Sequence, residues 1–495
     1  MSEAVLAEPK PQREFMGQPL GLATLFTTEM WERFSYYGMR ALLVLYLVAP
    51  ENMGGLGLET ALALSIYGVY SAMVYLLSVP GGWIADRLWG PRRTVWWGAV
   101  VIACGHYFLA VPVGWSIWPG MVLIAAGTGL LKPNISAMVG ELYDGDTDEG
   151  ARRDAGFSIF YMGINIGGFI APLICGYLGQ TIDWHLGFGA AGVGMTIALI
   201  VYVAAGPKTL GNIGKRVPDP APHRLRVKIR NWVIGIVVVF GILFAIDFAA
   251  GTFEPSHVID VLILITLITP IAYFTKIFRT PTLSLIERDR MKAYIWIFIG
   301  AVMFWLIFDQ GGSLLNIFAD ENTDRSIGGF TFPASWMQSI DPIGIIIFAP
   351  VFAYMWLKLG KRAPTLPAKF ALAIALIGLS FLLMGALSYV YSNELAPWEL
   401  LALIILVQVA AELLLSPTGL SASTKLAPAG LESQVLALWF LATAVGDAIG
   451  GKVAGLQPVI GNVWYFTLLG GLAVILAIIF TTQIKRLHGL MQGVH

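Results

Sequence analysis

The sequence predicts an all-α membrane protein with fourteen membrane-spanning helices. Of its 495 residues, 57% are hydrophobic and only 13% are charged, and the mean hydropathy is +0.73. Soluble domains carry about 25% charged residues, so this composition indicates a protein embedded in lipid. Apolar runs of about 20 residues, each long enough to cross a ~30 Å hydrocarbon core, recur along the whole chain.

The apolar runs fall into groups of six, two and six. We expect a cytoplasmic tail (1–18), a six-helix bundle (19–206), a cytoplasmic linker (207–230), two inserted helices (231–278), a second six-helix bundle (279–486) and a cytoplasmic tail (487–495). The predicted spans cover 20–48, 60–85, 94–113, 118–140, 155–179, 187–206, 231–251, 258–278, 293–319, 337–358, 368–391, 398–424, 432–456 and 462–484.

Lys and Arg gather in alternate connections between the predicted spans. One connection holds Arg87, Arg92 and Arg93, whereas a connection on the other side holds Asp183 and no Lys or Arg. By the positive-inside rule, both termini are expected in the cytoplasm of a cell whose inner (plasma) membrane holds the chain. The linker itself is basic, which fits either a solvated loop or a lipid-headgroup site.

The composition excludes several classes of function. Basic and acidic residues balance at 31 each, which argues against a nucleic-acid partner. Only Cys104 and Cys175 occur, both in apolar runs, so we expect no disulfide framework, no metal and no cofactor. The polar start lacks the features of a secretory signal. No Ser/His pair or phosphate loop indicates an enzyme, and His106 is interpreted as a packing residue.

The first predicted span carries an unusual set of polar side chains. Between positions 29 and 40 it holds two carboxylates, two guanidiniums and two phenols, namely Glu29, Glu32, Arg33, Tyr36, Tyr37 and Arg40. At about 100° per residue, Glu29, Arg33, Tyr36 and Arg40 share one helical stripe. A charge in mid-membrane costs roughly 2.5–3.5 kcal/mol, so this stripe indicates either a transport site or a buried ion network.

Four more ionisable residues lie within later predicted spans. Lys132 precedes Pro133 near the middle of its span, where it either reaches toward the interface or pairs with a carboxylate. Asp309 and Glu412 are each deep in an apolar run. Asp341 precedes Pro342, so it serves as a helix cap, an ionisable group or part of a ligand site.

The layout and motifs of the sequence resemble those of one superfamily and, more narrowly, of one family. Two six-span halves joined by a basic linker are the layout of the major facilitator superfamily, and the loop from Gly82 to Arg93 resembles its signature. The motif Glu29-x-x-Glu32-Arg33-Phe34-x-Tyr36-Tyr37-Gly38 and the segment from Phe160 to Gly167 resemble the proton-dependent oligopeptide transporter family. The two inserted spans match its bacterial members.

The resemblance implies a major facilitator fold and a monomer that imports di- and tripeptides with protons by alternating access. It implies that Lys132 faces Glu29 and Glu32 and, with Arg33, receives the peptide carboxylate. It also implies that Glu412, helped by Asn165, binds the peptide ammonium. Partners other than peptide, protons and lipid are not expected.

Two positions depart from the family pattern. Asp309 stands where many bacterial members have glutamate, and Asp341 stands where asparagine is usual. With Arg40 as its partner across the outer cavity, Asp309 is expected to carry a proton, or else to form a static gate. The aromatic residues Tyr36, Tyr37, Tyr70 and Trp439 are expected to line side-chain pockets, with ordinary packing as the alternative.

Other interpretations remain open at this point. The chain could transport another small solute such as nitrate, a drug or a sugar, because a fold hosts several functions. An intramembrane enzyme and a channel are more distant alternatives. Asp447 and Lys452 are expected to pair imperfectly with each other, and the sequence offers no partner for Asp247.

Overall fold

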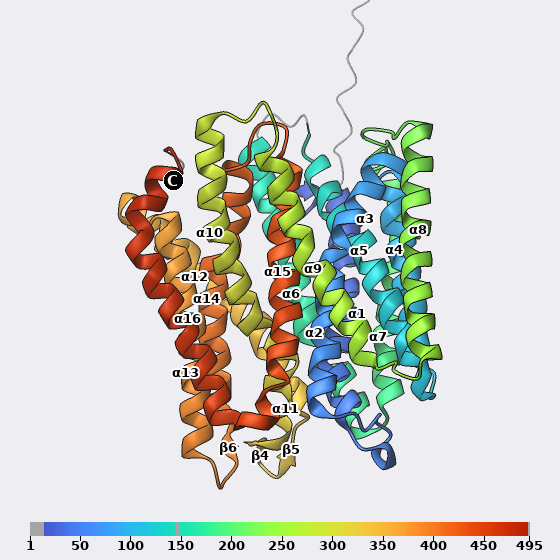
Figure 1. The fold of residues 1–495 in the computed structure, drawn as a ribbon, viewed down its shortest axis with the longest axis vertical. Helices are drawn as coiled ribbons and strands as arrows, with labels where there is room; N and C mark the ends of the chain where they lie inside the picture. Colours follow the sequence, from blue (N-terminus) through green and yellow to red (C-terminus); the bar gives the residue numbers. More distant parts are fainter. Residues whose placement is uncertain (1–13, 145–148, 494–495) are drawn as a thin grey trace, which may run out of the picture.

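The computed structural model describes residues 14–144 and 149–493, most of which lie in long helices (Figure 1). The first half contains α1 (Leu20–Val48), α2 (Thr60–Leu76), α3 (Ser78–Ile84), α4 (Pro91–Leu109), α5 (Ile117–Glu141), α6 (Glu149–Thr181) and α7 (Trp184–Thr209). Then come α8 (His223–Ala249) and α9 (Pro255–Phe278). The second half contains α10 (Leu285–Phe308), α11 (Leu314–Glu321), α12 (Ile340–Leu359), α13 (Leu366–Val390), α14 (Trp398–Lys425), α15 (Glu432–Ala454) and α16 (Gln457–Leu490).

The fourteen predicted spans are present. Within the described residues, 12 helical segments are long and apolar enough to cross a membrane. The other two spans are α1, which carries the four charged residues, and α4, which begins with Arg92 and Arg93 in its first turn. The protein is therefore an all-α, multi-pass membrane protein.

Six short strands of the described chain lie in the segments before and between the helices. The strands are β1 (Glu14–Phe15), β2 (Gln18–Pro19), β3 (Thr323–Asp324), β4 (Ser326–Ile327), β5 (Phe330–Thr331) and β6 (Ala396–Pro397). β1 pairs antiparallel with β2, β4 pairs antiparallel with β5, and β3 pairs parallel with β6. Most of the predicted tail 1–18 lies outside the described residues, as do the last two residues of the predicted tail 487–495.

Three predicted segments differ in detail. The run 60–85 is divided at Leu77 into α2 and α3. The run 293–319 is divided by a short 3-10 turn, η4 (Asp309–Gly312). A Cβ on Gly312 would overlap the Tyr67 hydroxyl, so a larger residue here would require Tyr67 and Arg40 to shift. The third difference is that α8 begins at His223, within the predicted linker.

Each half packs mainly within itself. α1 packs against α6 and α7, α4 against α5, α13 against α14 and α16, and α10 against α15. α2 lies along α15, and these two helices join the halves. At their crossing a Cβ on Gly451 would lie 2.7 Å from the Cα of Gly68, so both glycines permit the close approach. In contrast, α8 has no buried residue, which is typical of a lipid-facing helix.

The two halves are hydrogen-bonded at one end of the bundle. Among the described residues, each direct hydrogen bond between α1–α7 and the second half comes from the later part of α1 or α6. These bonds join Arg40 to Asp309, Ala41 to Asn316, Phe169 to Ser339, Leu173 to Trp336 and Gln180 to Ser335.

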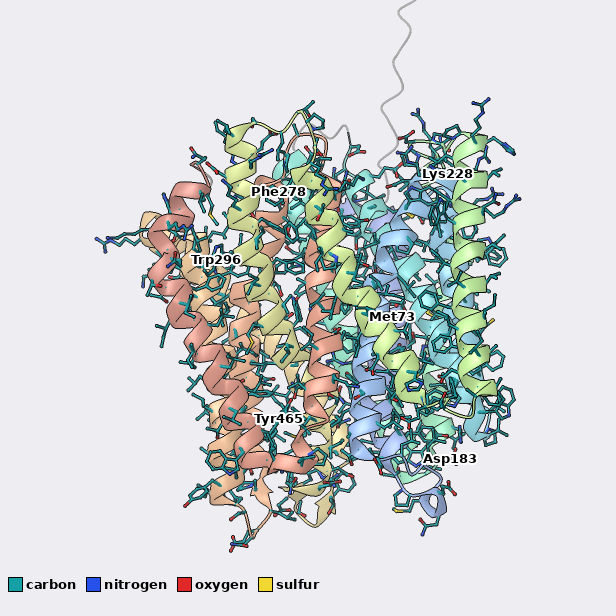
Figure 2. All side chains as sticks on the ribbon, viewed as in Figure 1. Met73, Asp183, Lys228, Phe278, Trp296 and Tyr465 are labelled. Atoms are coloured by element: carbon teal, nitrogen blue, oxygen red, sulfur yellow. The ribbon has the colours of Figure 1, made fainter. Side chains whose placement is uncertain are left out.

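This closed end lies away from the chain's C-terminus. α11 and β4 to β6 lie at the lower edge of Figure 1, and the C-terminus lies at the upper edge. Figure 2 places Lys228 at the upper end and Asp183 at the lower end. The basic end and the closed end of the bundle are therefore opposite ends.

Candidate functional site

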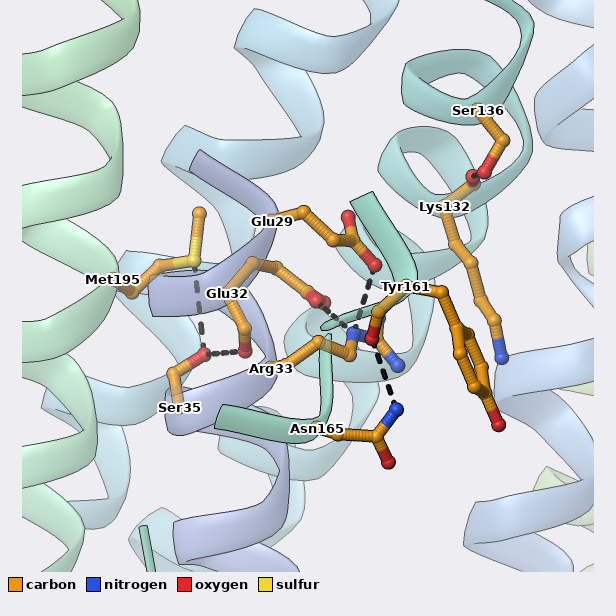
Figure 3. Close-up of polar contacts among 9 residues, drawn as sticks. All are labelled: Glu29, Glu32, Arg33, Ser35, Lys132, Ser136, Tyr161, Asn165 and Met195. Atoms are coloured by element: carbon orange, nitrogen blue, oxygen red, sulfur yellow. Dashed lines mark hydrogen bonds and ion pairs between the residues drawn. The ribbon is translucent and has the colours of Figure 1, made fainter. Parts of the chain in front are cut away.

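The charged residues of α1 nearest the middle of the helix form a buried cluster, which we call the α1 triad (Glu29, Glu32 and Arg33). Arg33 Nε lies 3.1 Å from Glu29 Oε1 and 2.5 Å from Glu32 Oε2 (Figure 3). All three side chains are at most 4% exposed. The i,i+4 spacing of Glu29 and Arg33 places both groups on the same helical face, so a single helix builds the cluster.

The α1 triad has unused hydrogen-bonding capacity. Within the described part of the chain, Glu29 Oε2, Glu32 Oε1 and Arg33 Nη2 have no hydrogen-bond partner. Buried polar atoms are nearly always paired, so three unpaired atoms in one cluster indicate a site that accepts an external partner. A carboxylate fits Arg33 Nη2, and a proton fits either glutamate.

The expected pairing of Lys132 with Glu29 and Glu32 is wrong in this structure. No ion pair within 4.0 Å involves Lys132 among the described residues, and Arg33 forms the short contacts with both glutamates. Lys132 Nζ lies 4.1 Å from the ring centroid of Tyr75, over its face, which is a cation–π contact. Lys132 is therefore a cation without a carboxylate partner beside the triad.

Tyr161 and Asn165 of α6 face the same region. In the view of Figure 3, Tyr161 is drawn between Arg33 and Lys132, with Asn165 below. Asn165 Nδ2 donates to the carbonyl of Tyr161 at 2.9 Å, which leaves its amide oxygen available. Tyr161 is 40% exposed although it lies in the middle of a membrane helix, so it borders open space.

A second charged cluster joins the halves, and we call it the outer gate (Arg40, Tyr67 and Asp309). Arg40 Nη2 lies 2.9 Å from Asp309 Oδ1, and Arg40 Nε donates to the Tyr67 hydroxyl at 2.6 Å. The side chains of the ion pair are 12% and 13% exposed. Because the pair links α1 to η4, it can persist only while this end of the bundle is closed.

Acidic residues of the second half lie near α1. Asp341 and Glu412 are both close to Tyr37 and Tyr161. Asp341 Oδ1 and Glu412 Oε2 are buried and have no hydrogen-bond partner among the described residues. The structure places Tyr37, Arg40 and Asp341 around one cavity between the halves. The helix-cap interpretation of Asp341 has no support here, because α12 shows no side-chain cap bond.

The other aromatic residues that were expected to line side-chain pockets differ in what they contact. The guanidinium of Arg33 lies 5.1 Å from the ring centroid of Tyr36. Tyr70 is buried with a hydroxyl that has no partner in the described chain. Trp439 packs against Phe370, and it also fills the space above Gly419, where a Cβ would lie 2.0 Å from the indole. Trp439 is thus mainly a packing residue in this structure.

Two further expectations are corrected. Lys452 does not pair with Asp447, because its ammonium binds Asp260 of α9 at 2.7 Å. Asp247 has partners: its carboxylate binds His257 Nδ1 at 2.7 Å and also accepts from Thr252.

Sequence reasoning also missed Tyr67, Tyr75 and Tyr161. The sequence could have identified Tyr161, because it lies one helical turn before Asn165 within the segment from Phe160 to Gly167.

Among the described residues, no group of three His, Cys, Asp or Glu side chains could hold a metal ion. The polar groups that this site brings together are cations, carboxyls and phenols. Such a set can bind a zwitterion and exchange protons.

Comparison with known proteins agrees with this arrangement. A family model described as "POT family" matches residues 92–464. The chain is 45% identical over 486 residues to the "Uncharacterized transporter YclF" of Bacillus subtilis, covering 98% of this chain and 97% of that protein. It is 41% identical to the "Di-/tripeptide transporter" of Lactococcus lactis subsp. cremoris, covering 98% and 99%.

A solved structure shares the fold. The crystal structure of "peptide transporter POT in complex with sulfate" superposes with a TM-score of 0.94 at 45% identity, covering 98% of each chain. The match extends over both helical halves and the two inserted helices, since so little of either chain is left out. The family model, the relatives and this superposition agree, and the chain belongs to the POT family of membrane transporters.

Proposed function

We propose that the chain imports di- and tripeptides together with protons by alternating access. The observation that carries this proposal is that Tyr37 lies near cations of the first half and also near carboxyl groups of the second half. Arg33 and Lys132 in the first half offer cations, and Glu412 and Asp341 in the second half offer carboxyl groups. The names of the relatives, which include a di-/tripeptide transporter, point to the same substrate class.

A peptide is a zwitterion whose two charged ends lie a set distance apart whatever its side chains. In our proposal Arg33 and Lys132 receive its carboxylate, while Glu412, with Asn165, receives its ammonium group. Asp341 strengthens the acidic side. A ligand held at both ends bridges the two halves, so its binding favours their closure around it.

Protons provide the driving force in this proposal. One proton that moves down a potential of 100 mV supplies roughly 2.3 kcal/mol, enough for about fifty-fold accumulation of a neutral solute. Glu29, Glu32 and Asp309 lie beside cations, so protonating any of them releases an ion pair. A protonated Asp309 cannot pair with Arg40, so its protonation favours the open state of the outer gate.

The hydrogen bonds between the halves support an inward-facing state for this structure. They are confined to the end away from the basic connections, and by the positive-inside rule that end faces outward. In this orientation both termini lie in the cytoplasm and the protein lies in the inner membrane. We propose that it works there as a monomer and that it carries out no covalent chemistry.

Uptake by purified protein in liposomes tests the proposal. With an inward acid gradient, we expect labelled dipeptide and tripeptide to accumulate and to remain chemically intact, and an N-acetylated dipeptide amide to be excluded because it lacks both charged ends. Equal uptake after the gradient is dissipated would contradict proton coupling. Competition by nitrate without competition by dialanine would contradict the peptide substrate.

A further inference from the structure

Asp447 on α15 is a buried acid that the mechanism above does not use. It is 3% exposed, and neither carboxyl oxygen has a hydrogen-bond partner among the described residues. Lys452, one turn further along the helix, is engaged by Asp260. Because a buried, unpaired carboxylate is very costly, such a group takes up a proton instead.

The neighbour of Asp447 is the gate residue Asp309. The carboxyl groups of the two residues lie close to each other. Both line one small cavity between the halves, together with Tyr67 and Gly451. Arg40 occupies Asp309 Oδ1, whereas Asp309 Oδ2 has no partner in the described chain. Asp309 Oδ2 and the carboxyl group of Asp447, which both lack another partner in the described chain, are therefore available to each other.

The charged and titratable groups around Asp447 come from four other elements. Tyr67 and Tyr75 belong to α2, Arg40 to α1, Asp309 to η4 and Lys132 to α5. Arg40 is in direct contact with Asp309, and Lys132 lies over Tyr75. Arg40, Asp309 and Asp447 together have no net charge when the two carboxyl groups share one proton. The cluster therefore favours the state with one shared proton.

We propose that Asp447 holds this proton while the outer gate is closed and passes it to Asp309 when Arg40 withdraws. This inference rests on the proposed proton-coupled uptake. In the closed state the Asp447 hydroxyl donates to Asp309 Oδ2, which keeps Asp309 charged for Arg40. On opening, the O–H bond of Asp447 breaks and an O–H bond forms at Asp309 Oδ2. Asp309 becomes neutral, and Asp447 becomes a carboxylate that takes its next proton from the outer medium.

The variant Asp447→Asn tests this role, because asparagine keeps the size and donates a hydrogen bond but cannot release a proton. We expect gradient-driven dipeptide accumulation to fall about tenfold or more, while exchange of labelled for unlabelled peptide without a gradient persists. Asp260→Asn is the matched control, since it removes a carboxylate that contacts the same helix from outside the cavity. This control should accumulate peptide like the wild type.

Infrared difference spectra provide a readout that does not depend on transport. The wild-type protein should show the C=O stretch of a protonated carboxylic acid at neutral pH. This band should be absent in Asp447→Asn, shifted in the conservative Asp447→Glu and unchanged in Asp260→Asn. If Asp447→Asn does not fold, the shift in Asp447→Glu decides the question.

The outcomes separate the two proposals. Failure of the wild-type protein to accumulate peptide would overturn the proposed function itself. Normal accumulation by the wild type and by Asp447→Asn would overturn only the role of Asp447. A carboxylic-acid band that stays unchanged in Asp447→Asn, or in Asp447→Glu if the former is unfolded, would also overturn it.

Discussion

The α1 triad and the outer gate use the same chemistry but differ in how they are connected. The triad lies on one helix, so its ion pairs are kept when the two halves move. The outer gate joins α1 and α2 to η4, so its ion pair has to break whenever the outer end opens. In the proposed mechanism the triad binds substrate and protons throughout the cycle, whereas the outer gate forms only when its end of the bundle is closed.

The largest effect is expected from breaking the α1 triad. Glu32→Gln should reduce net dipeptide uptake roughly 100-fold, because the fully buried Glu32 loses both its charge and its capacity to exchange a proton. Peptide exchange without a gradient should persist. Uptake into liposomes measures both quantities.

The control for this variant is Glu59→Gln, an exposed position before α2. It should behave like the wild type. Net uptake by Glu32→Gln at the wild-type rate would mean that the triad is only a structural ion network.

Breaking the outer gate should have the next largest effect. Asp309→Asn removes the charge partner of Arg40 while keeping the side-chain size. For a partly exposed pair we expect the closed state to lose about 2 kcal/mol, which shifts the ratio of closed to open molecules roughly 30-fold. Distances between spin labels at Glu51 and Ser326, on the outer loops of the two halves, measure this ratio.

Asp320→Asn is the matched control, because Asp320 binds Arg325 of its own segment at 3.0 Å and does not link the halves. An unchanged distance distribution in Asp309→Asn would show that the outer gate does not hold the halves together.

The crossing of α2 and α15 offers a purely steric comparison. Gly451→Leu should disfavour closure, because even a Cβ there would lie 2.7 Å from the Cα of Gly68. Overpacking of this kind costs about 1–3 kcal/mol, so peptide uptake should fall by about tenfold. Gly235→Leu on the exposed helix α8 has open space around it and should leave uptake unchanged. Equal uptake by both variants would contradict a close crossing in the transport cycle.

The smallest effect is expected for the ion pair between α9 and α15. Asp260 and Lys452 are more than half exposed, and exposed pairs contribute about 0–1 kcal/mol. Asp260→Asn should therefore shift the midpoint of thermal unfolding by only a few degrees and leave uptake intact. A large loss of uptake would show that the inserted helices take part in transport.

The sequence predicted the fold well because membrane spans are set by length and hydropathy alone. The ends of α1 were predicted to the residue, since Pro19 and Pro50 lie just outside the mostly apolar run. The break at Asp309 was missed, because it depends on Gly312 making room for Tyr67 and Arg40 from other helices. Helix propensity depends on local sequence and therefore does not predict contacts with residues of other helices.

The site was predicted in part. The motif on α1 identified the charged residues, and the pair of Asp309 with Arg40 was expected from the resemblance to the family and is present. The partner of Lys132 was missed because its ammonium lies over the ring of Tyr75, a contact that depends on how α2 packs against α5. Asp447 was assigned to Lys452 by sequence distance, whereas the packing of α9 and η4 on α15 decides the neighbours of each.

Simultaneous recording of peptide and proton entry tests the central claim most directly. Liposomes that contain the protein and a trapped pH-sensitive dye receive labelled dialanine at acidic external pH. We predict that peptide addition speeds acidification of the lumen, and that this extra proton entry rises and falls with peptide uptake when external pH is varied. Peptide accumulation without any peptide-dependent proton entry would contradict the account.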